Sequence, residues 1–187
     1  MKQLFKGMLV RLAADSPEVL AGAYLRWDRD SEYRRLADSD PTQIWSEKKI
    51  KEYIEKEMEG DPPRTLRFSI HTLAEDKLIG TASLVPNWVH ADAMLGIIIG
   101  DRGYWGRGYG TDAMELILQY GFLELNLHRI TLGVHSYNAR ARRVYEKVGF
   151  KVEGVMRGDT LKEGRRTDGV EMGILRQEWL ALRGAET

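Results

Sequence analysis

The 187-residue sequence contains no cysteine, which excludes a disulfide framework, a thiolate zinc site and a cysteine nucleophile. It also lacks an apolar run approaching the roughly 18 residues needed to cross a bilayer, and no apolar signal segment follows Met1. The four histidines, at positions 71, 90, 128 and 135, lack the spacing of metal ligands. We therefore expect a cytoplasmic protein without a metal or a membrane partner.

An excess of charge of either sign is also missing, since 28 basic residues balance 28 acidic ones. This balance gives no electrostatic reason to expect nucleic acid as a partner. There is no internal repeat, low-complexity tract or long linker either. The length then predicts a single domain over residues 1–187, with residues 1–7 and 181–187 at its periphery.

Apolar periodicity predicts an α/β domain with elements in the order β-α-α-β-β-β-α-β-α-β-β. A helix connects the apolar strand 91–100 to strand 129–135, so these two strands should run parallel. Residues 29–42 are expected to be a polar connection, and Asp61-Pro62-Pro63 to end the second helix. The other strands are predicted at residues 8–12, 66–70, 78–85, 150–157 and 167–175, and the helices at 17–28, 43–59, 111–125 and 139–148.

A glycine-rich segment, residues 102–111, lies between a buried strand and an amphipathic helix. Its glycines at 106, 108 and 110 allow tight turns and a close approach to a ligand. The amides that follow are unpaired donors at a helix N-terminus, where the helix dipole favours anions. The spacing indicates a phosphate site, although an ordinary strand-to-helix turn explains the glycines almost as well.

Two common phosphate-binding patterns fit poorly. The Gly-Lys-Ser/Thr triplet of a P-loop is absent. Gly108-x-Gly110-x-x-Ala113 matches the dinucleotide fingerprint, but the next strand ends in His135-Ser136 where an acidic ribose ligand would be required.

A second motif follows about thirty residues later, with fixed positions Asn138, Ala141, Tyr145, Lys147 and Gly149-Phe150. Together with the glycine loop it resembles the GNAT (GCN5-related N-acetyltransferase) family. The loop pattern Gln/Arg-x-x-Gly-x-Gly/Ala falls on Trp105-Gly106-Arg107-Gly108-Tyr109-Gly110, with Trp105 in place of Gln or Arg. The second pattern, Asn-x-x-Ala-x-x-x-Tyr-x-Lys-x-Gly-Phe, matches at every fixed position. The branch most similar contains ribosomal-protein N-terminal and spermidine acetyltransferases.

This resemblance implies a mixed, mostly antiparallel sheet with one splayed parallel strand pair and helices on both faces. It implies acetyl-CoA as co-substrate, with the strand backbone at Ile97, Ile98 and Ile99 pairing with pantetheine. The loop amides from Gly106 to Thr111 would take the pyrophosphate. The full expected cofactor set is Ile97, Ile98, Ile99, Trp105, Gly106, Arg107, Gly108, Tyr109, Gly110, Thr111, Asn138 and Ala141.

The resemblance also assigns Tyr145 as the general acid that protonates the leaving thiolate. Packing against its own helix is the competing interpretation of this tyrosine. Relatives often carry a Glu where this chain has Met94, so the base is open. The candidates are His90, Asp92, His135 and Ser136, and neutral histidine is a suitable base near pH 7. Each is more readily explained by a structural role, and an amine that is already deprotonated competes with all of them.

The expected acceptor is a primary amine, either a small molecule or a protein N-terminus. Five acidic residues could attract a cationic amine, but interleaved arginines favour a solvated face of mixed charge; they are Asp28, Asp30, Glu32, Asp38 and Asp40. The alternative function is a non-catalytic acyl-CoA-binding module of the same fold. Many relatives are dimers, so the resemblance also suggests a homodimer.

Overall fold

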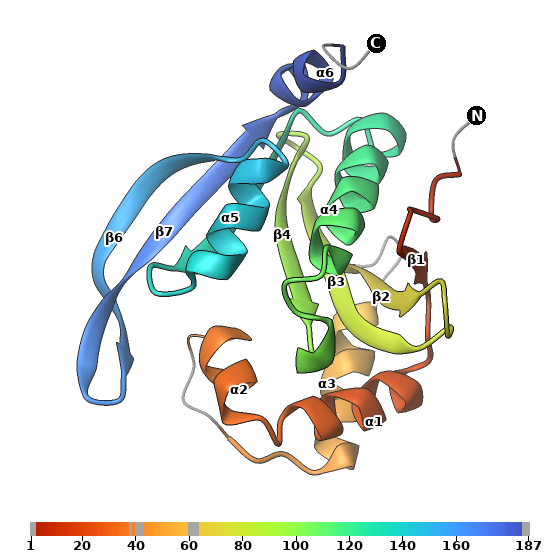
Figure 1. Cartoon of the computed structure of the whole chain (residues 1–187), viewed down its shortest axis with the longest axis vertical. Coiled ribbons are helices and arrows are strands. Elements are labelled where there is room, and N and C mark those ends of the chain that lie inside the picture. The colour runs from red at the N-terminus through yellow and green to blue at the C-terminus, as the bar shows by residue number, and fades with distance from the viewer. Residues whose placement is uncertain (1–2, 38, 40–42, 60–63, 185–187) are drawn as a thin grey trace.

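The fold is built on one sheet with strand order β1-β2-β3-β4-β5-β7-β6 (Figure 1). The computed structural model describes residues 3–37, 39, 43–59 and 64–184. Neighbouring strands are antiparallel except for β4 and β5, which are parallel. The strands are β1 (Val10–Ala13), β2 (Leu66–Thr72), β3 (Leu78–Asn87), β4 (Asp92–Ile99), β5 (Arg129–His135), β6 (Lys151–Lys162) and β7 (Arg165–Leu175).

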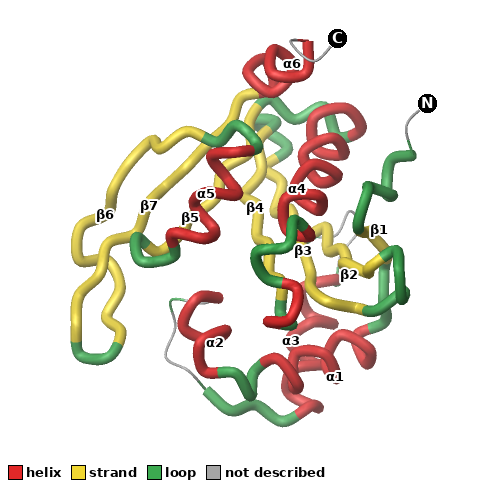
Figure 2. Tube along the Cα trace, viewed as in Figure 1, coloured by secondary structure: helices red, strands yellow, loops and turns green. Residues whose placement is uncertain are grey.

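Helices pack on both faces of this sheet (Figure 2). In β4, Ile97 belongs to the large core cluster that contains the helix α4, whereas Ile98 packs with Trp27 of the helix α1. Successive side chains of a strand point to opposite faces, so α4 and α1 cover opposite sides of β4. The helices are α1 (Pro17–Trp27), α2 (Ser31–Ala37), α3 (Glu47–Met58), α4 (Tyr109–Gln119), α5 (Ala139–Lys147) and α6 (Arg176–Gly184).

The parallel pair separates after a short paired stretch. β4 and β5 pair at Asp92/Arg129, Ala93/Ile130 and Met94/Thr131, and no further. Beyond this point β4 remains paired with β3 as far as Ile99, and β5 remains paired with β7 as far as His135. Both strands are therefore held on their outer sides while a gap opens between them, which confirms the mixed sheet with one splayed parallel pair.

Two helices differ from the sequence prediction. The stretch 29–42, expected to be a connection, contains α2, whose Tyr33 is buried against Trp27. The Asp30 carboxylate starts this helix by accepting from the backbone N–H groups of Glu32 and Tyr33. The C-terminal helix α6 was not predicted either, and it buries Trp179 against Phe122.

Two observed element boundaries differ from those that the apolar periodicity predicted. α3 begins at Glu47, not at residue 43, because the Ser46 hydroxyl accepts from the Lys49 amide as an N-cap. β6 extends to Lys162, so β6 and β7 form a much longer hairpin than predicted. Asp61-Pro62-Pro63, the predicted end of the second helix, lies outside the described residues.

Candidate functional site

A cavity of about 900 Å³ occupies the gap between β4 and β5 and extends to both faces of the sheet. Its floor is the end of β4 that β5 leaves unpaired, from Leu95 to Ile99. The glycine loop closes one end, and α5 and the β6–β7 hairpin form the opposite wall. The sequence-predicted residues in the lining are Ile97, Ile98, Ile99, Trp105, Gly106, Gly108, Gly110, Thr111, His135, Asn138, Ala141 and Tyr145.

The glycine loop ends in a left-handed turn that starts α4. Gly106 has a φ of 69° and Gly108 a φ of 90°, a region that side-chain-bearing residues rarely adopt. Gly108 is the N-cap of α4, so its amide and those of Tyr109, Gly110 and Thr111 have no acceptor within the helix. The helix dipole places positive potential at the same point, which makes this end of the cavity suited to an anion.

Trp105, the departure from the family pattern, fastens the loop to β4. Its indole Nε1–H donates to the carbonyl of Ile99 over 2.6 Å. The Arg140 guanidinium of α5 lies 3.8 Å from the centre of the indole ring, and that of Arg102 lies 5.4 Å from it. Arg102 is itself held by Asp30. The indole thus joins β4, α5 and the start of α2 at the mouth of the cavity.

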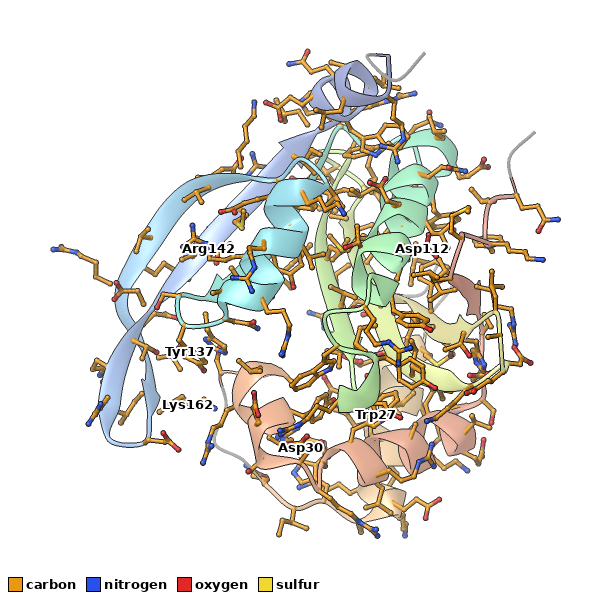
Figure 3. The ribbon with its side chains drawn as sticks, viewed as in Figure 1. Trp27, Asp30, Asp112, Tyr137, Arg142 and Lys162 are labelled. Atoms are coloured by element: carbon orange, nitrogen blue, oxygen red, sulfur yellow. The ribbon has the colours of Figure 1, made fainter. Side chains whose placement is uncertain are left out.

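Asp112, in the first turn of α4, fastens the chain that leads into β1 (Figure 3). Its carboxylate accepts from the backbone N–H groups of Met8, Leu9 and Val10 at 2.8–3.0 Å. Its negative charge is therefore directed to these three amides. No local pattern singles out this residue, because its partners lie 102–104 positions away.

Backbone groups of β4 alternate between β3 and the gap. The Ile98 carbonyl points toward β3, where a Cβ added to Gly80 would collide with it. The Ile99 carbonyl points the other way, since it accepts from Trp105. In an antiparallel pair the N–H and C=O of one residue point to the same side, so Ile97 and Ile99 present both groups to the gap. The third predicted isoleucine, Ile98, turns its backbone toward β3, so it can line the cavity only with its side chain.

Helix α5 places Asn138 and Tyr145 along the cavity wall. The Asn138 side chain accepts from the Ala141 amide at 3.1 Å, which confirms its predicted N-cap role. Tyr145 is 8% exposed and packs with Phe150, with ring centroids 6.1 Å apart. Burial raises the pKa of the Tyr145 phenol to about 12. The phenol is therefore protonated, and a potential hydrogen-bond donor, over the whole physiological range.

Five predicted residues lie outside the cavity lining, including His90 and Ser136. Asp92 opens β4 at the end where the two strands are still paired, opposite Arg129, and it does not line the cavity. The side chain of Arg107 donates to the Gly103 carbonyl at 3.1 Å. Tyr109 packs edge-on against Tyr104, 5.1 Å away. For Arg107 and Tyr109 only the backbone amides remain as candidates for anion binding.

His135 lines the cavity at the end of β5, as expected, but its ring is engaged. It stacks on Tyr137 with ring centroids 4.9 Å apart and an angle of 6° between the planes. Tyr137 in turn donates its hydroxyl to the Arg35 carbonyl of α2 over 2.7 Å (Figure 3). This stack therefore also connects α2 to the end of β5.

Sequence reasoning missed several charged residues of the lining. Arg140, Arg143 and Lys147 from α5 give the cavity a basic wall, and burial lowers the pKa of the Arg140 guanidinium from its usual value. Their position within the second motif was the available signal. The β6–β7 hairpin contributes two carboxylates, Asp159 and Glu171, and the place of Glu171 depends on its register with β5.

The acidic residues that could attract an amine are paired with arginines where the structure describes them, and Asp38 and Asp40 lie outside the described residues. Asp30 and Glu32 both pair with Arg102, and Asp28 lies 3.3 Å from Arg34. Arg102 holds the pKa of the Asp30 carboxyl below its usual value. This segment is thus a face of mixed charge, the interpretation that the interleaved arginines favoured.

Among residues 3–37, 39, 43–59 and 64–184, no group of three or more His, Asp or Glu side chains is placed to hold a metal ion. The helices of this part of the chain are all too short or too polar to cross a membrane.

Comparison with known proteins gives one consistent result. A family model described as an acetyltransferase (GNAT) domain matches residues 9–151. The chain is 37% identical over 141 residues to YjcK of Bacillus subtilis, a probable N-acetyltransferase, covering 74% of this chain and 76% of that protein. It is also 37% identical over 95 residues to spermidine N(1)-acetyltransferase of Escherichia coli K12, covering 51% of this chain and 50% of that protein.

A solved structure is similar over nearly its whole length. Spermidine N-acetyltransferase from Vibrio cholerae, crystallised with CoA and spermine, superposes with a TM-score of 0.81 at 26% identity. The alignment covers 91% of this chain and 98% of that one.

Proposed function

The chain belongs to the GNAT family and is an acyl-CoA-dependent N-acetyltransferase, and from this premise we propose that it transfers acetyl from acetyl-CoA to a primary amine by direct attack. The observation that carries the proposal is the splayed gap. It has unpaired strand backbone on its floor, an anion site at one end and a protonated phenol in its wall.

The pyrophosphate and the pantetheine arm of acetyl-CoA have candidate binding groups in this cavity. The amides of Gly108 to Thr111 would bind the pyrophosphate, with Arg140 and Arg143 supplying positive charge nearby. The pantetheine amides would pair with the backbone of Ile97 and with the Ile99 amide. The Ile99 carbonyl already accepts from Trp105, so the loop and the pantetheine strand would be held as one unit.

Tyr145 would serve as the general acid. The amine nitrogen attacks the thioester carbonyl carbon, the new C–N bond forms, and the C–S bond breaks as the intermediate collapses. The departing sulfur takes the phenolic proton of Tyr145, and the phenolate recovers a proton that the nitrogen has lost. Because burial raises its pKa to about 12, the phenol is fully protonated before each turnover.

The acceptor class follows from the relatives and the cavity together. The relative from Escherichia coli and the solved structure from Vibrio cholerae are both named for spermidine, and that structure also contains spermine. The cavity of this chain reaches both faces of the sheet, so acetyl-CoA and an amine could enter from opposite sides. We propose a cationic primary amine, either a polyamine or a protein N-terminus. Assembly as a homodimer in the cytoplasm is part of the same proposal, and light scattering would test the dimer.

The experiment is thiol release from acetyl-CoA with a panel of polyamines, amino acids and peptide N-termini, followed by mass spectrometry of the amine. We expect an acetylated product from at least one primary amine. Tyr145→Phe should lower kcat by about 10²-fold or more while acetyl-CoA still binds. Tyr120→Phe is the matched control, because Tyr120 packs with Phe5 and Phe68 away from this cavity.

The proposal has two distinct points of failure. If acetyl-CoA binds and no amine of the panel is acetylated, transfer to a primary amine is wrong. If Tyr145→Phe has the kcat of the Tyr120→Phe control at every pH, only the assignment of the acid is wrong.

A further inference from the structure

We propose that Glu171 is the carboxylate that receives the proton of the acceptor amine. This inference rests on the proposed function and adds the group that the sequence left open. Glu171 lies on β7 between β5 and β6, and it lines the cavity.

The position of Glu171 depends on a glycine in the neighbouring strand. Glu171 pairs with Gly133 of β5, and paired residues of antiparallel strands have side chains on the same face. Since Gly133 has no side chain, the Glu171 carboxylate leans over it: a Cβ there would lie only 3.2 Å from Oε1. β5 is the strand that borders the gap. The carboxylate therefore reaches across β5 toward the space where the thioester would lie.

Glu171 faces the gap from the side opposite Tyr145. In β5, Leu132 and Val134 belong to the core cluster beneath α4, so Gly133 between them points to the other face. Tyr145 belongs to that same core cluster. A proton donor on one face and a proton acceptor on the other would bracket a thioester in the gap. The amine would then arrive beside Glu171 while the sulfur departs beside Tyr145.

Small and exposed residues leave the approach to Glu171 open. On β4, Gly96 is exposed and presents no side chain toward the gap, and Met94 is 59% exposed. Among the described residues Glu171 has no hydrogen-bond or ion-pair partner. Glu57, another carboxylate of the lining, is paired with Arg67. Glu171 is thus half-buried and free to accept from an incoming ammonium group.

Other titratable groups face the same space and must be separated by experiment. His135 is the nearest alternative base along β5, two positions beyond Gly133 on the same face, but its ring is stacked on Tyr137. Asp159 lies over Gly169 and accepts from the Thr160 hydroxyl. The remaining titratable side chains of the lining are Tyr24, Tyr33, Glu57, Arg67, Tyr104, Arg140, Arg143, Tyr145 and Lys147.

The ammonium group donates to a Glu171 oxygen, and the nitrogen lone pair becomes available as its proton moves to the carboxylate. The nitrogen then bonds to the carbonyl carbon and the C–S bond breaks. Tyr145 protonates the sulfur and is itself reprotonated by the second nitrogen proton through solvent, while Glu171 returns its proton to water. The net products are an N-acetyl amine, the CoA thiol and one released proton.

The expected loss follows from the pKa of the amine. For an amine with a pKa near 10.4, only about one molecule in 2,500 is neutral at pH 7. An enzyme without its base depends on that fraction, so Glu171→Gln should lose about 10²- to 10³-fold in kcat/KM at pH 7. The deficit should shrink roughly tenfold per pH unit as the pH approaches the amine pKa.

The test measures kcat and KM for spermidine, or for whichever amine proves active, from about pH 6 to about pH 10. Glu171→Gln keeps the shape of the side chain, and Glu171→Asp should retain part of the activity at pH 7. Gly133→Ala is an independent probe, because its methyl group would push the carboxylate away without removing it. Glu124→Gln is the matched control, since Glu124 is exposed on the surface away from the cavity. His135→Gln tests the competing base.

A pH-dependent loss in Glu171→Gln, with acetyl-CoA affinity unchanged, supports the assignment. A kcat/KM profile equal to that of Glu124→Gln would overturn it. So would a loss of constant size at every pH, which would indicate a structural role, or a pH-dependent loss found only in His135→Gln. If Glu171→Gln does not fold, the activity of Gly133→Ala decides by the same criteria. If the wild-type protein acetylates no amine, both this assignment and the proposed function fail. If the wild type acetylates an amine and the Glu171 variants do so equally well, only this assignment fails and the proposed function stands.

Discussion

Replacing Trp105 should separate two contacts that hold the glycine loop to the rest of the site. Trp105→Phe removes the indole N–H that donates to the Ile99 carbonyl but keeps an aromatic ring beside Arg140. Trp105→Leu removes both. Trp105 is half-buried, so the Phe substitution costs mainly the hydrogen bond.

A neutral hydrogen bond contributes about 0.5–1.5 kcal/mol to stability, and about 1 kcal/mol lowers the Tm of a domain of this size by roughly 2–4 °C. The cation–π contact with Arg140 adds about 0.5–1 kcal/mol, so Trp105→Leu should lose more. If acetyl-CoA must then order the loop at a cost of about 1 kcal/mol, its Kd rises about fivefold in Trp105→Phe.

Thermal unfolding and isothermal titration with acetyl-CoA measure both quantities. Trp45→Phe is the control, because the Trp45 indole Nε1–H also donates a hydrogen bond, to Gln43, but lies outside the cavity. Weaker acetyl-CoA binding in Trp105→Phe than in Trp45→Phe is the expected result. Equal Kd values for these two variants would show that the indole N–H does not organise the loop.

Gly108→Val forces a β-branched residue to a φ of 90°, at a cost of about 1–3 kcal/mol. Because this strain falls at the anion site, acetyl-CoA binding should be lost. Calorimetry checks this, with Gly154→Val as the control because Gly154 has no close neighbours. Asp112→Asn leaves one oxygen for three backbone amides, so the protein should lose about 1–3 kcal/mol of stability, and hydrogen exchange at Met8–Val10 should accelerate. The pKa of Tyr145 is raised by burial to about 12 from an unfolded value near 10, so the unfolded state ionises first and stability falls as the pH rises through this window. Between about pH 8 and about pH 11 the wild type should lose about 1.4 kcal/mol more than Tyr145→Phe in urea unfolding, and an equal loss in both would refute the buried position of the phenol.

The parts of the fold that the sequence predicted are those with local signals. The alternation in β2, the glycine loop and the Asn138 cap each depend on residues a few positions apart. Helix α2 has no apolar periodicity, and it exists because Asp30 caps it and Tyr33 is buried against Trp27. The cap is a local signal that was missed, whereas the Arg102 side chain that holds the Asp30 carboxylate lies 72 positions away. Without apolar periodicity, the segment 29–42 reads as a polar connection.

In the site, too, the residues of local motifs could be predicted and those placed by strand register could not. The two motifs identified the anion end and Tyr145, but the apolar run Ile97–Ile99 could not show which residues turn their backbone to the gap. That depends on the register with β3, which directs Ile98 away. Glu171 depends on the register between β5 and β7. The available signal was Gly133, because a glycine inside an apolar strand often marks a close approach.

The central claim is that acetyl-CoA occupies the gap between β4 and β5, and residue-resolved amide exchange with and without acetyl-CoA tests it most directly. The amides of Ile97 and Ile99, which face the gap, should gain protection on binding, together with those of Gly108 to Thr111. The Ile98 amide, directed toward β3, should change little. Protection that spares Ile97 and Ile99, or that appears only outside the cavity, would contradict the claim.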